Sequence, residues 1–148
     1  MNNHVIDVAL GNAAADMVIK NGRLLNVHTG EIYEADIAVA DKVIAAVGPL
    51  GEKTIGENTR VIDAAGKIMV PGFIDAHIHF ESSMLTFTEF SRMLVSHGTT
   101  AVATDLMEIA IVAGEDGINE IFKESEGLPV KLLHPVPAFM SEEGELQT

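Results

Sequence analysis

The sequence predicts an α/β protein in which a small β-sandwich-like domain precedes the beginning of a TIM-type (β/α)8 barrel. Short β-rich segments separated by turn residues fill the chain up to about residue 70. Beyond that point, apolar strand-like segments alternate with amphipathic helical segments, which is typical of a parallel sheet. About three strand–helix units fit into this part, whereas a complete barrel has eight units and about 250 residues.

The first domain is expected over residues 1–70 and begins with a short helix over residues 4–12. Short strands follow from Asp16 onward. Asn21-Gly22 lies between two apolar runs, and this dipeptide is a strong signal for a hairpin turn. We therefore expect an antiparallel sheet or half-sandwich of about six short strands.

The second domain is expected over residues 71–148. Thr86 and Glu89 form a capping box, which predicts the start of a helix. Gly114 is expected to interrupt the following helix. The expected elements in chain order are a strand over residues 70–80, a helix from Thr86 to His97, a strand over 99–105, a helical region from 107 broken at Gly114, and a strand over about 130–136.

Composition limits the functions that are open to this chain. It has 9 basic and 22 acidic residues and a formal net charge of −13, so we expect no binding to nucleic acid or to anionic membranes. It has no cysteine, which excludes disulfides, thiolate ligands and a cysteine nucleophile. No apolar run reaches membrane-spanning length, and the amino terminus lacks the features of a signal peptide. These observations favour a cytoplasmic protein that acts on a small molecule.

Two histidines at the end of the 70–80 strand are the principal candidates for a functional site. Alternate side chains of a strand share a face, so His77 and His79 are expected to point to one side with Asp75 and Glu81. Two imidazoles in this arrangement can bind one metal ion. Asp75 is expected to accept a hydrogen bond from a metal-bound imidazole. The alternative is a histidine pair on an edge strand that binds no metal.

Polar residues after the first and second strands complete the candidate site, because loops at the carboxyl ends of barrel strands form active sites. Ser82 and Ser83 are candidates for substrate binding, or else belong to a polar loop before the helix. Glu81, Asp105 and Glu108 are candidate catalytic residues. For the last two, capping of the next helix and interaction with its dipole are equally consistent with the sequence.

The segment VIDAAGKIMVPGFIDAHIHF resembles the amidohydrolase superfamily, whose members join a small β-sandwich to a metal-bearing barrel. VALGNAAADMVIKNG, FESSMLTFTEF and HGTTAVATD resemble more specifically the adenine deaminases of bacteria and archaea. The resemblance covers about residues 8–138. It implies that His77 and His79 bind one ion of a binuclear iron or manganese centre, with zinc as another option, and that the remaining ligands lie beyond Thr148. It also implies hydrolysis of adenine to hypoxanthine and ammonia.

The sequence departs from the adenine deaminase pattern at two places. Met107 stands where that pattern has a histidine, and His134-Pro135 replaces residues near the end of the third strand. A different purine or a cyclic amidine therefore stays open as the substrate. Two other functions also stay open: hydrolysis of a cyclic amide, as in dihydroorotases and hydantoinases, and a catalytically inactive assembly module.

We also expect the chain to be the amino-terminal portion of a larger enzyme. Three parallel strands alone would leave an unpaired edge and an uncovered apolar face. Later parts of the polypeptide or a partner subunit in a homo-oligomer would complete the barrel.

Overall fold

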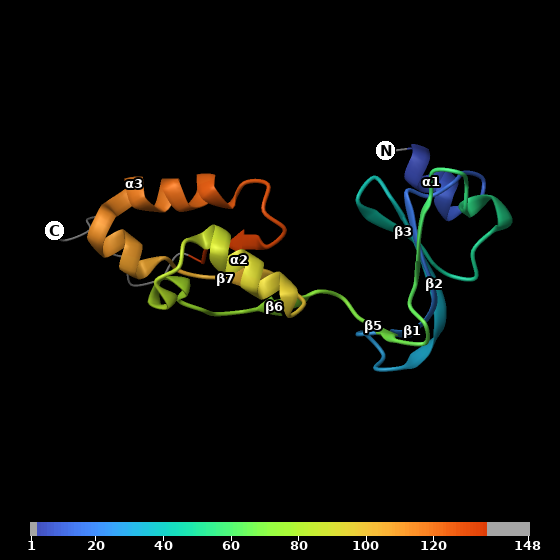
Figure 1. Cartoon of the computed structure of the whole chain (residues 1–148), viewed down its shortest axis with the longest axis horizontal. Helices are drawn as coiled ribbons and strands as arrows, with labels where there is room; N and C mark the ends of the chain where they lie inside the picture. Colours follow the sequence, from blue (N-terminus) through green and yellow to red (C-terminus); the bar gives the residue numbers. More distant parts are fainter. Residues whose placement is uncertain (1–2, 136–148) are drawn as a thin grey trace. The chain divides into compact units, whose positions relative to one another are not determined.

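The computed structural model describes residues 3–135 and divides the chain into two compact units, Met1–Pro71 and Gly72–Thr148 (Figure 1). Each unit has its own sheet and its own hydrophobic core. Within residues 3–135, no helix combines the length and the apolar character that crossing a membrane requires.

The first unit contains one α-helix and a five-stranded sheet. Its elements are α1 (Asn3–Ala9), β1 (Met17–Leu25), β2 (Ile32–Ala40), β3 (Val43–Gly48), the 3₁₀ helix η1 (Glu52–Thr54), β4 (Arg60–Asp63) and β5 (Ile68–Met69). The strand order is β3-β2-β1-β4, and β5 also pairs with β1. β2 is antiparallel to β1 and β3, whereas β4 and β5 are parallel to β1. The expectation of purely antiparallel pairing is therefore wrong, because the sheet is mixed; it has five strands, where about six were expected.

Asn21-Gly22 lies inside β1 and does not form a hairpin turn. Asn21 adopts a φ of 57°, and the pairing with β2 shifts between Ile19 and Gly22, which is a β-bulge. The backbone N–H of Asn21 donates to Asp36, and its side-chain amide donates to Asp63. The predicted hairpin is therefore wrong, because neighbouring strands supply hydrogen-bond partners that hold the bulge and let β1 continue.

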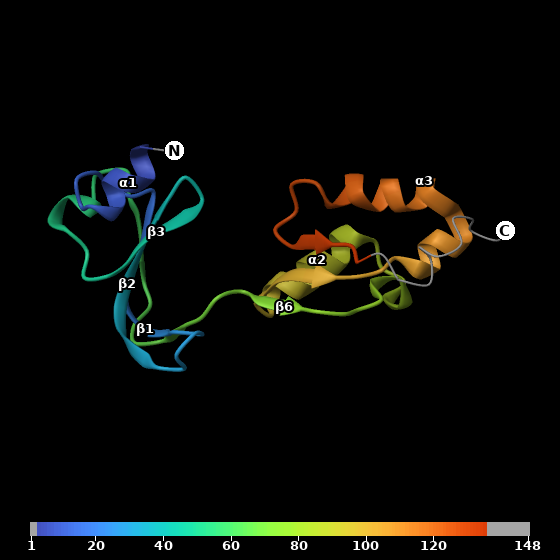
Figure 2. The ribbon, with the colours of Figure 1, turned by 180° about the vertical axis from the view of Figure 1, so that it is seen from behind.

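The core of the first unit lies between α1 and the sheet. α1 contacts β2 and β3 (Figure 2). Val8 of α1 packs with Val18 of β1 and with two small residues of β2, Ala38 and Ala40. The small side chains on β2 let the helix approach the sheet closely.

The second unit alternates strands and helices as predicted. Its elements are β6 (Phe73–Asp75), the 3₁₀ helix η2 (Phe80–Ser83), α2 (Phe87–Ser96), β7 (Thr99–Ala103), α3 (Met107–Ser125) and β8 (Lys131–Leu133). The strand order is β6-β7-β8, and both pairs are parallel. The predicted parallel arrangement is confirmed. The third strand ends at Leu133, and its predicted end at residue 136 lies outside the described residues.

The helix boundaries follow the signals in the sequence. The Thr86 hydroxyl accepts a hydrogen bond from the backbone N–H of Glu89 and caps α2, which ends at Ser96 with His97 as its C-cap. Gly114 has φ 62° and ψ −155°, so it interrupts α3 and bends it, as Figure 1 shows. The predicted helix start at Thr86 and the predicted helix break at Gly114 are confirmed.

The core of the second unit lies between the sheet and its two helices. α2 contacts β7, and α3 contacts β8. Ile78, between the two candidate metal-binding histidines, packs against this core. The buried core residues are Phe80, Phe87, Phe90, Val102, Leu106 and Val130.

Candidate metal centre

The candidate histidines lie after β6 and not on it. Oδ1 of Asp75 accepts a hydrogen bond of 3.1 Å from the backbone N–H of His77, which is an Asx turn that ends the strand. The chain then rejoins its neighbour, because the Ile78 N–H donates to the Ala103 carbonyl at 2.9 Å. The predicted strand over residues 70–80 is therefore wrong in its extent, because β6 covers only Phe73–Asp75. The strand ends there because the Asp75 side chain accepts the hydrogen bond of the His77 backbone N–H.

The two imidazoles nevertheless lie together. The ring centroids of His77 and His79 are 5.0 Å apart, and the ring planes make an angle of 84°. Asp105 joins them from the end of β7, because the carboxyl ends of parallel strands meet at one edge of a sheet. One ligand atom from each of these three residues lies within 4.8 Å of the other two. This group can hold one metal ion.

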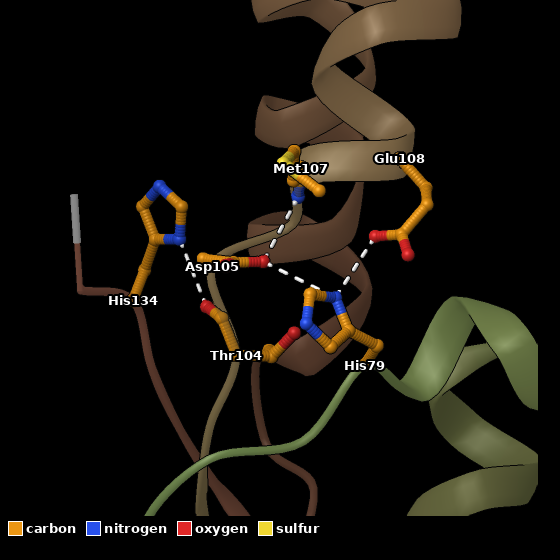
Figure 3. Close-up of polar contacts among 6 residues, drawn as sticks. All are labelled: His79, Thr104, Asp105, Met107, Glu108 and His134. Carbon is orange, nitrogen blue, oxygen red and sulfur yellow. Dashed lines mark hydrogen bonds and ion pairs between the residues drawn. The ribbon is translucent and has the colours of Figure 1, made fainter. Parts of the chain in front are cut away.

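Asp105 connects the two histidines to the start of α3. Its Oδ1 lies 3.4 Å from Nδ1 of His79 and accepts a hydrogen bond of 3.2 Å from the backbone N–H of Met107 (Figure 3). Any residue other than proline at position 107 can donate this bond. Replacement of the expected histidine by Met107 therefore leaves the support of Asp105 intact.

Glu108, in the first turn of α3, makes the shortest polar contact with the site. Its Oε2 lies 3.0 Å from Nδ1 of His79 (Figure 3). The hydrogen bond with Glu108 raises the pKa of His79, and the negative charges of Asp105, Glu108 and Glu81 add to this rise. A hydrogen bond from its own backbone N–H and the contact with His79 lower the pKa of Glu108.

Glu81, in η2, brings a third carboxylate to His79. Both of its carboxylate oxygens are buried, and neither has a well-formed hydrogen bond with any residue that the structure describes. Burial raises the pKa of Glu81, and the charge of Glu108 adds to the rise. Ligand atoms of Glu81, His79, Asp105 and Glu108 all lie within 4.8 Å of one another.

This donor set fits a divalent metal. A carboxylate buried beside other carboxylates is unfavourable when its oxygens lack well-formed hydrogen bonds, and a bound cation relieves that cost. Imidazole and carboxylate donors without thiolate suit zinc, iron and manganese. The buried oxygens of Glu81, which have no well-formed hydrogen bond within residues 3–135, are thus the observation in this structure that agrees with a metal.

The other predicted site residues have local contacts. Asp75 is engaged by the backbone of His77, whereas we expected it to contact an imidazole. The Ser83 hydroxyl donates to the Phe80 carbonyl at 2.6 Å, so it stabilises η2. Ser82 is exposed in the same turn. Ser83 is exposed as well, so the two serines differ in that this hydrogen bond engages the Ser83 hydroxyl.

His134, directly after β8, also has a fixed ring. Its Nδ1 lies 3.0 Å from the carbonyl oxygen of Thr104 (Figure 3). Its ring also makes an edge-to-face contact with Phe122, with 5.7 Å between the ring centroids. A carbonyl oxygen only accepts, so Nδ1 of His134 carries a hydrogen. This residue is anchored to the end of β7, beside Asp105.

The contact between Glu108 and His79 was not predicted from the sequence. The signal available there is the spacing of Asp105 and Glu108, which places two carboxylates three residues apart where a strand passes into a helix. That spacing is equally typical of helix capping, so it does not identify the histidine partner.

A cavity of about 410 Å³ lies elsewhere, in the first unit. It is lined by residues around the β1 bulge, including Asn21, Arg23 and Asp36. None of the candidate metal ligands lines it, so the cavity is not part of the histidine site.

Comparison with known sequences agrees with the resemblance described above. A model of the amidohydrolase family matches residues 68–146. Adenine deaminase 3 from Rhizobium meliloti is 46% identical over 135 residues, which are 90% of this chain and 23% of that protein. An adenine deaminase from Listeria welshimeri is 45% identical over 141 residues, which are 95% of this chain and 24% of that protein. The chain therefore spans between 23% and 24% of the length of these two curated relatives.

Two solved structures are similar in fold. The N-acyl-D-glutamate deacylase from Bordetella bronchiseptica, solved with zinc and a phosphonate inhibitor, matches with a TM-score of 0.52 and 33% identity over 62% of this chain and 19% of its own. A D-aminoacylase described with a binuclear metal centre matches with a TM-score of 0.61 and 22% identity, over 82% of this chain and 29% of its own. The second likeness concerns the fold alone, which is α/β and of the TIM-barrel type.

Proposed function

Because the chain belongs to the amidohydrolase family, we propose that it forms part of a metal-dependent aminohydrolase that converts adenine and water into hypoxanthine and ammonia. Identities of 45% and 46% to adenine deaminases over at least 90% of the chain support this substrate. The observation that carries the proposal is the group formed by His77, His79 and Asp105, whose ligand atoms lie within 4.8 Å of one another.

We further propose that residues 1–70 form a small β-sandwich-like domain and that residues 71–148 begin the barrel. The parallel order β6-β7-β8 supports this division. Phe73 and Ile74 of β6 are 58% and 66% exposed, and apolar strand residues of this kind need covering by further elements. Later parts of the polypeptide, or a partner subunit in a homo-oligomer, would provide them.

His77 and His79 would hold the metal, with Asp105 as a third donor. The proposed centre is a binuclear one of iron or manganese, and zinc also suits these donors. When bound, the metal supplies Lewis-acid activation of water near neutral pH. Asp75 orients this group indirectly, by fixing the backbone of His77 through the Asx turn.

Carboxylates of the chain would move the proton. The reaction forms a C6–O bond and breaks the bond between C6 and the amino nitrogen of adenine. Of the two protons of water, one must pass to the leaving amine and the other to N1 of the ring. Glu81 is the candidate for this task because its oxygens have no well-formed hydrogen bond within residues 3–135. Asp105 and Glu108 are engaged by neighbouring groups. Ser82 is the candidate for contact with the purine.

The direct test is an assay of the full-length protein loaded with Mn²⁺ or Fe²⁺. We expect hypoxanthine and ammonia to appear in equal amounts from adenine. Turnover of a dihydropyrimidine, a hydantoin or an N-acyl-D-amino acid, but not of adenine, would show that the proposed substrate is wrong and would leave the family assignment unchanged. Absence of both metal binding and turnover would favour the inactive assembly module.

A further inference from the structure

We propose that Glu108 is a positioning residue that fixes the tautomer and the orientation of the His79 imidazole, so that His79 presents Nε2 to the metal. The inference rests on the proposed function, because that function makes His79 a ligand. Oε2 of Glu108 lies 3.0 Å from Nδ1 of His79. An ionised carboxylate only accepts hydrogen bonds, so Nδ1 must carry the hydrogen. In the neutral ring, the lone pair that can bind a metal is then on Nε2.

Two carboxylates face the same nitrogen, and the geometry favours Glu108. Oδ1 of Asp105 is 3.4 Å from Nδ1 of His79, which is longer than the usual N–H···O distance. That oxygen also accepts a hydrogen bond from the backbone of Met107 (Figure 3). Asp105 therefore has a partner of its own, and Glu108 is the main acceptor for His79.

The fold places Glu108 on a rigid support. Leu106, the N-cap of α3, and Ala110, in its first turn, lie on either side of Glu108 in the chain and are 0% and 3% exposed. The Ala110 N–H donates a hydrogen bond of 2.8 Å to the Leu106 carbonyl. The Glu108 side chain is itself 43% exposed, so it adds little to the core. Its carboxylate lies in the first turn of α3, where the helix dipole favours a negative charge. These features suit a residue that orients a neighbour.

In the proposed site, the Glu108 carboxylate contacts one nitrogen of the His79 imidazole, and the other nitrogen faces the metal position. A carboxylate on one nitrogen holds the ring and makes the other nitrogen a better ligand. Loss of such a partner typically weakens metal binding about 10- to 100-fold.

The first test reads the tautomer of His79 by ¹⁵N NMR of the metal-free full-length protein, at a pH where the ring is neutral. We expect Nδ1 to be protonated in the wild type and in Glu108→Gln, because the amide oxygen can still accept. Glu108→Ala should lose this preference, whereas Glu115→Ala, an exposed acid on the same helix, should keep it. His79→Ala identifies the resonances.

The second test measures the affinity for Mn²⁺ alone. We expect about 10- to 100-fold weaker binding in Glu108→Ala, a smaller loss in Glu108→Gln and no change in Glu115→Ala. A wild-type ring protonated on Nε2, or an Nδ1 tautomer that survives Glu108→Ala, overturns the inference even if the enzyme deaminates adenine. Conversely, failure to deaminate adenine with the expected tautomers and affinities refutes the proposed function alone.

Discussion

Oε2 of Glu108 lies 3.0 Å from Nδ1 of His79, although the two residues are 29 positions apart in the chain. His79 follows β6, and Glu108 begins the helix after β7. The pairing of β6 with β7 brings these two segments together. The candidate metal centre therefore depends on the parallel sheet, and not only on the two histidines of one segment.

Removal of either histidine should lower the metal content of the protein. We expect His77→Ala and His79→Ala to weaken binding by more than about tenfold, because each change removes a nitrogen donor that carboxylates do not replace. Metal per protomer after dialysis, measured by mass spectrometry, checks this. His28→Ala, an exposed histidine of the first unit, is the matched control. Equal metal content in all variants would refute the ligand assignment.

Replacement of Glu81 should have opposite effects on stability and on binding. We expect Glu81→Gln to stabilise the metal-free second unit by about 1 kcal/mol, because a neutral amide replaces a buried carboxylate without a well-formed hydrogen bond. The pKa of Glu81 is raised, so the wild type loses stability as the pH rises through that pKa, and the gain should be largest in alkaline solution.

Urea unfolding followed by circular dichroism, together with Mn²⁺ titration, checks the prediction for Glu81. Weaker Mn²⁺ binding should accompany the higher stability. Glu126→Gln, an exposed acid at the end of α3, should change neither quantity. A destabilised Glu81→Gln protein would show that the carboxylate has a favourable partner even without metal.

Local signals in the sequence were sufficient for much of the second unit. The capping residue Thr86 and the helix-breaking residue Gly114 act through the conformation of nearby backbone, so their effects can be read from short segments. Asn21-Gly22 could not be read in this way. Its outcome depends on Asp36 and Asp63, which belong to other strands and hold the bulge from both sides.

In the candidate site, too, features set by nearby residues could be predicted, whereas contacts between distant segments could not. The His-x-His motif identified His77 and His79, and the structure brings their rings together. Strand alternation did not anticipate the turn at Asp75, because a side chain there competes with the strand for a backbone N–H. The partner of His79 could not be predicted, because it depends on where α3 begins relative to the sheet.

Glu124 should stabilise the contact between the two helices. Its Oε1 accepts a hydrogen bond of 2.8 Å from the backbone N–H of Thr88, in the first turn of α2. Burial opposes the ionised form, but hydrogen bonds from Thr88 outweigh it and lower the pKa of Glu124. Glu124→Ala leaves this N–H without its acceptor, and we expect a loss of about 1 to 2 kcal/mol. Urea unfolding measures the loss, and Glu126→Ala should show none.

Asp63 should make the first unit sensitive to acid. Its Oδ1 accepts hydrogen bonds from the backbone N–H of Ala65 at 2.8 Å and from the side-chain amide of Asn21 at 3.2 Å. These bonds lower the pKa of Asp63 below 3.8. The stabilisation is therefore present above the unfolded-state pKa and is lost as the pH falls through the folded-state pKa.

The measurement for Asp63 uses the fluorescence of Tyr33, which is the one tyrosine of a chain without tryptophan and lies in β2. We expect the urea midpoint of the wild type to fall as the pH drops from about 5 through the folded-state pKa of Asp63. Asp63→Asn should show a smaller fall, because its amide oxygen accepts hydrogen bonds at every pH. Glu57→Gln, an exposed acid of the same unit, should follow the wild type. Parallel pH profiles for Asp63→Asn and the wild type would mean that the acid sensitivity comes from another group.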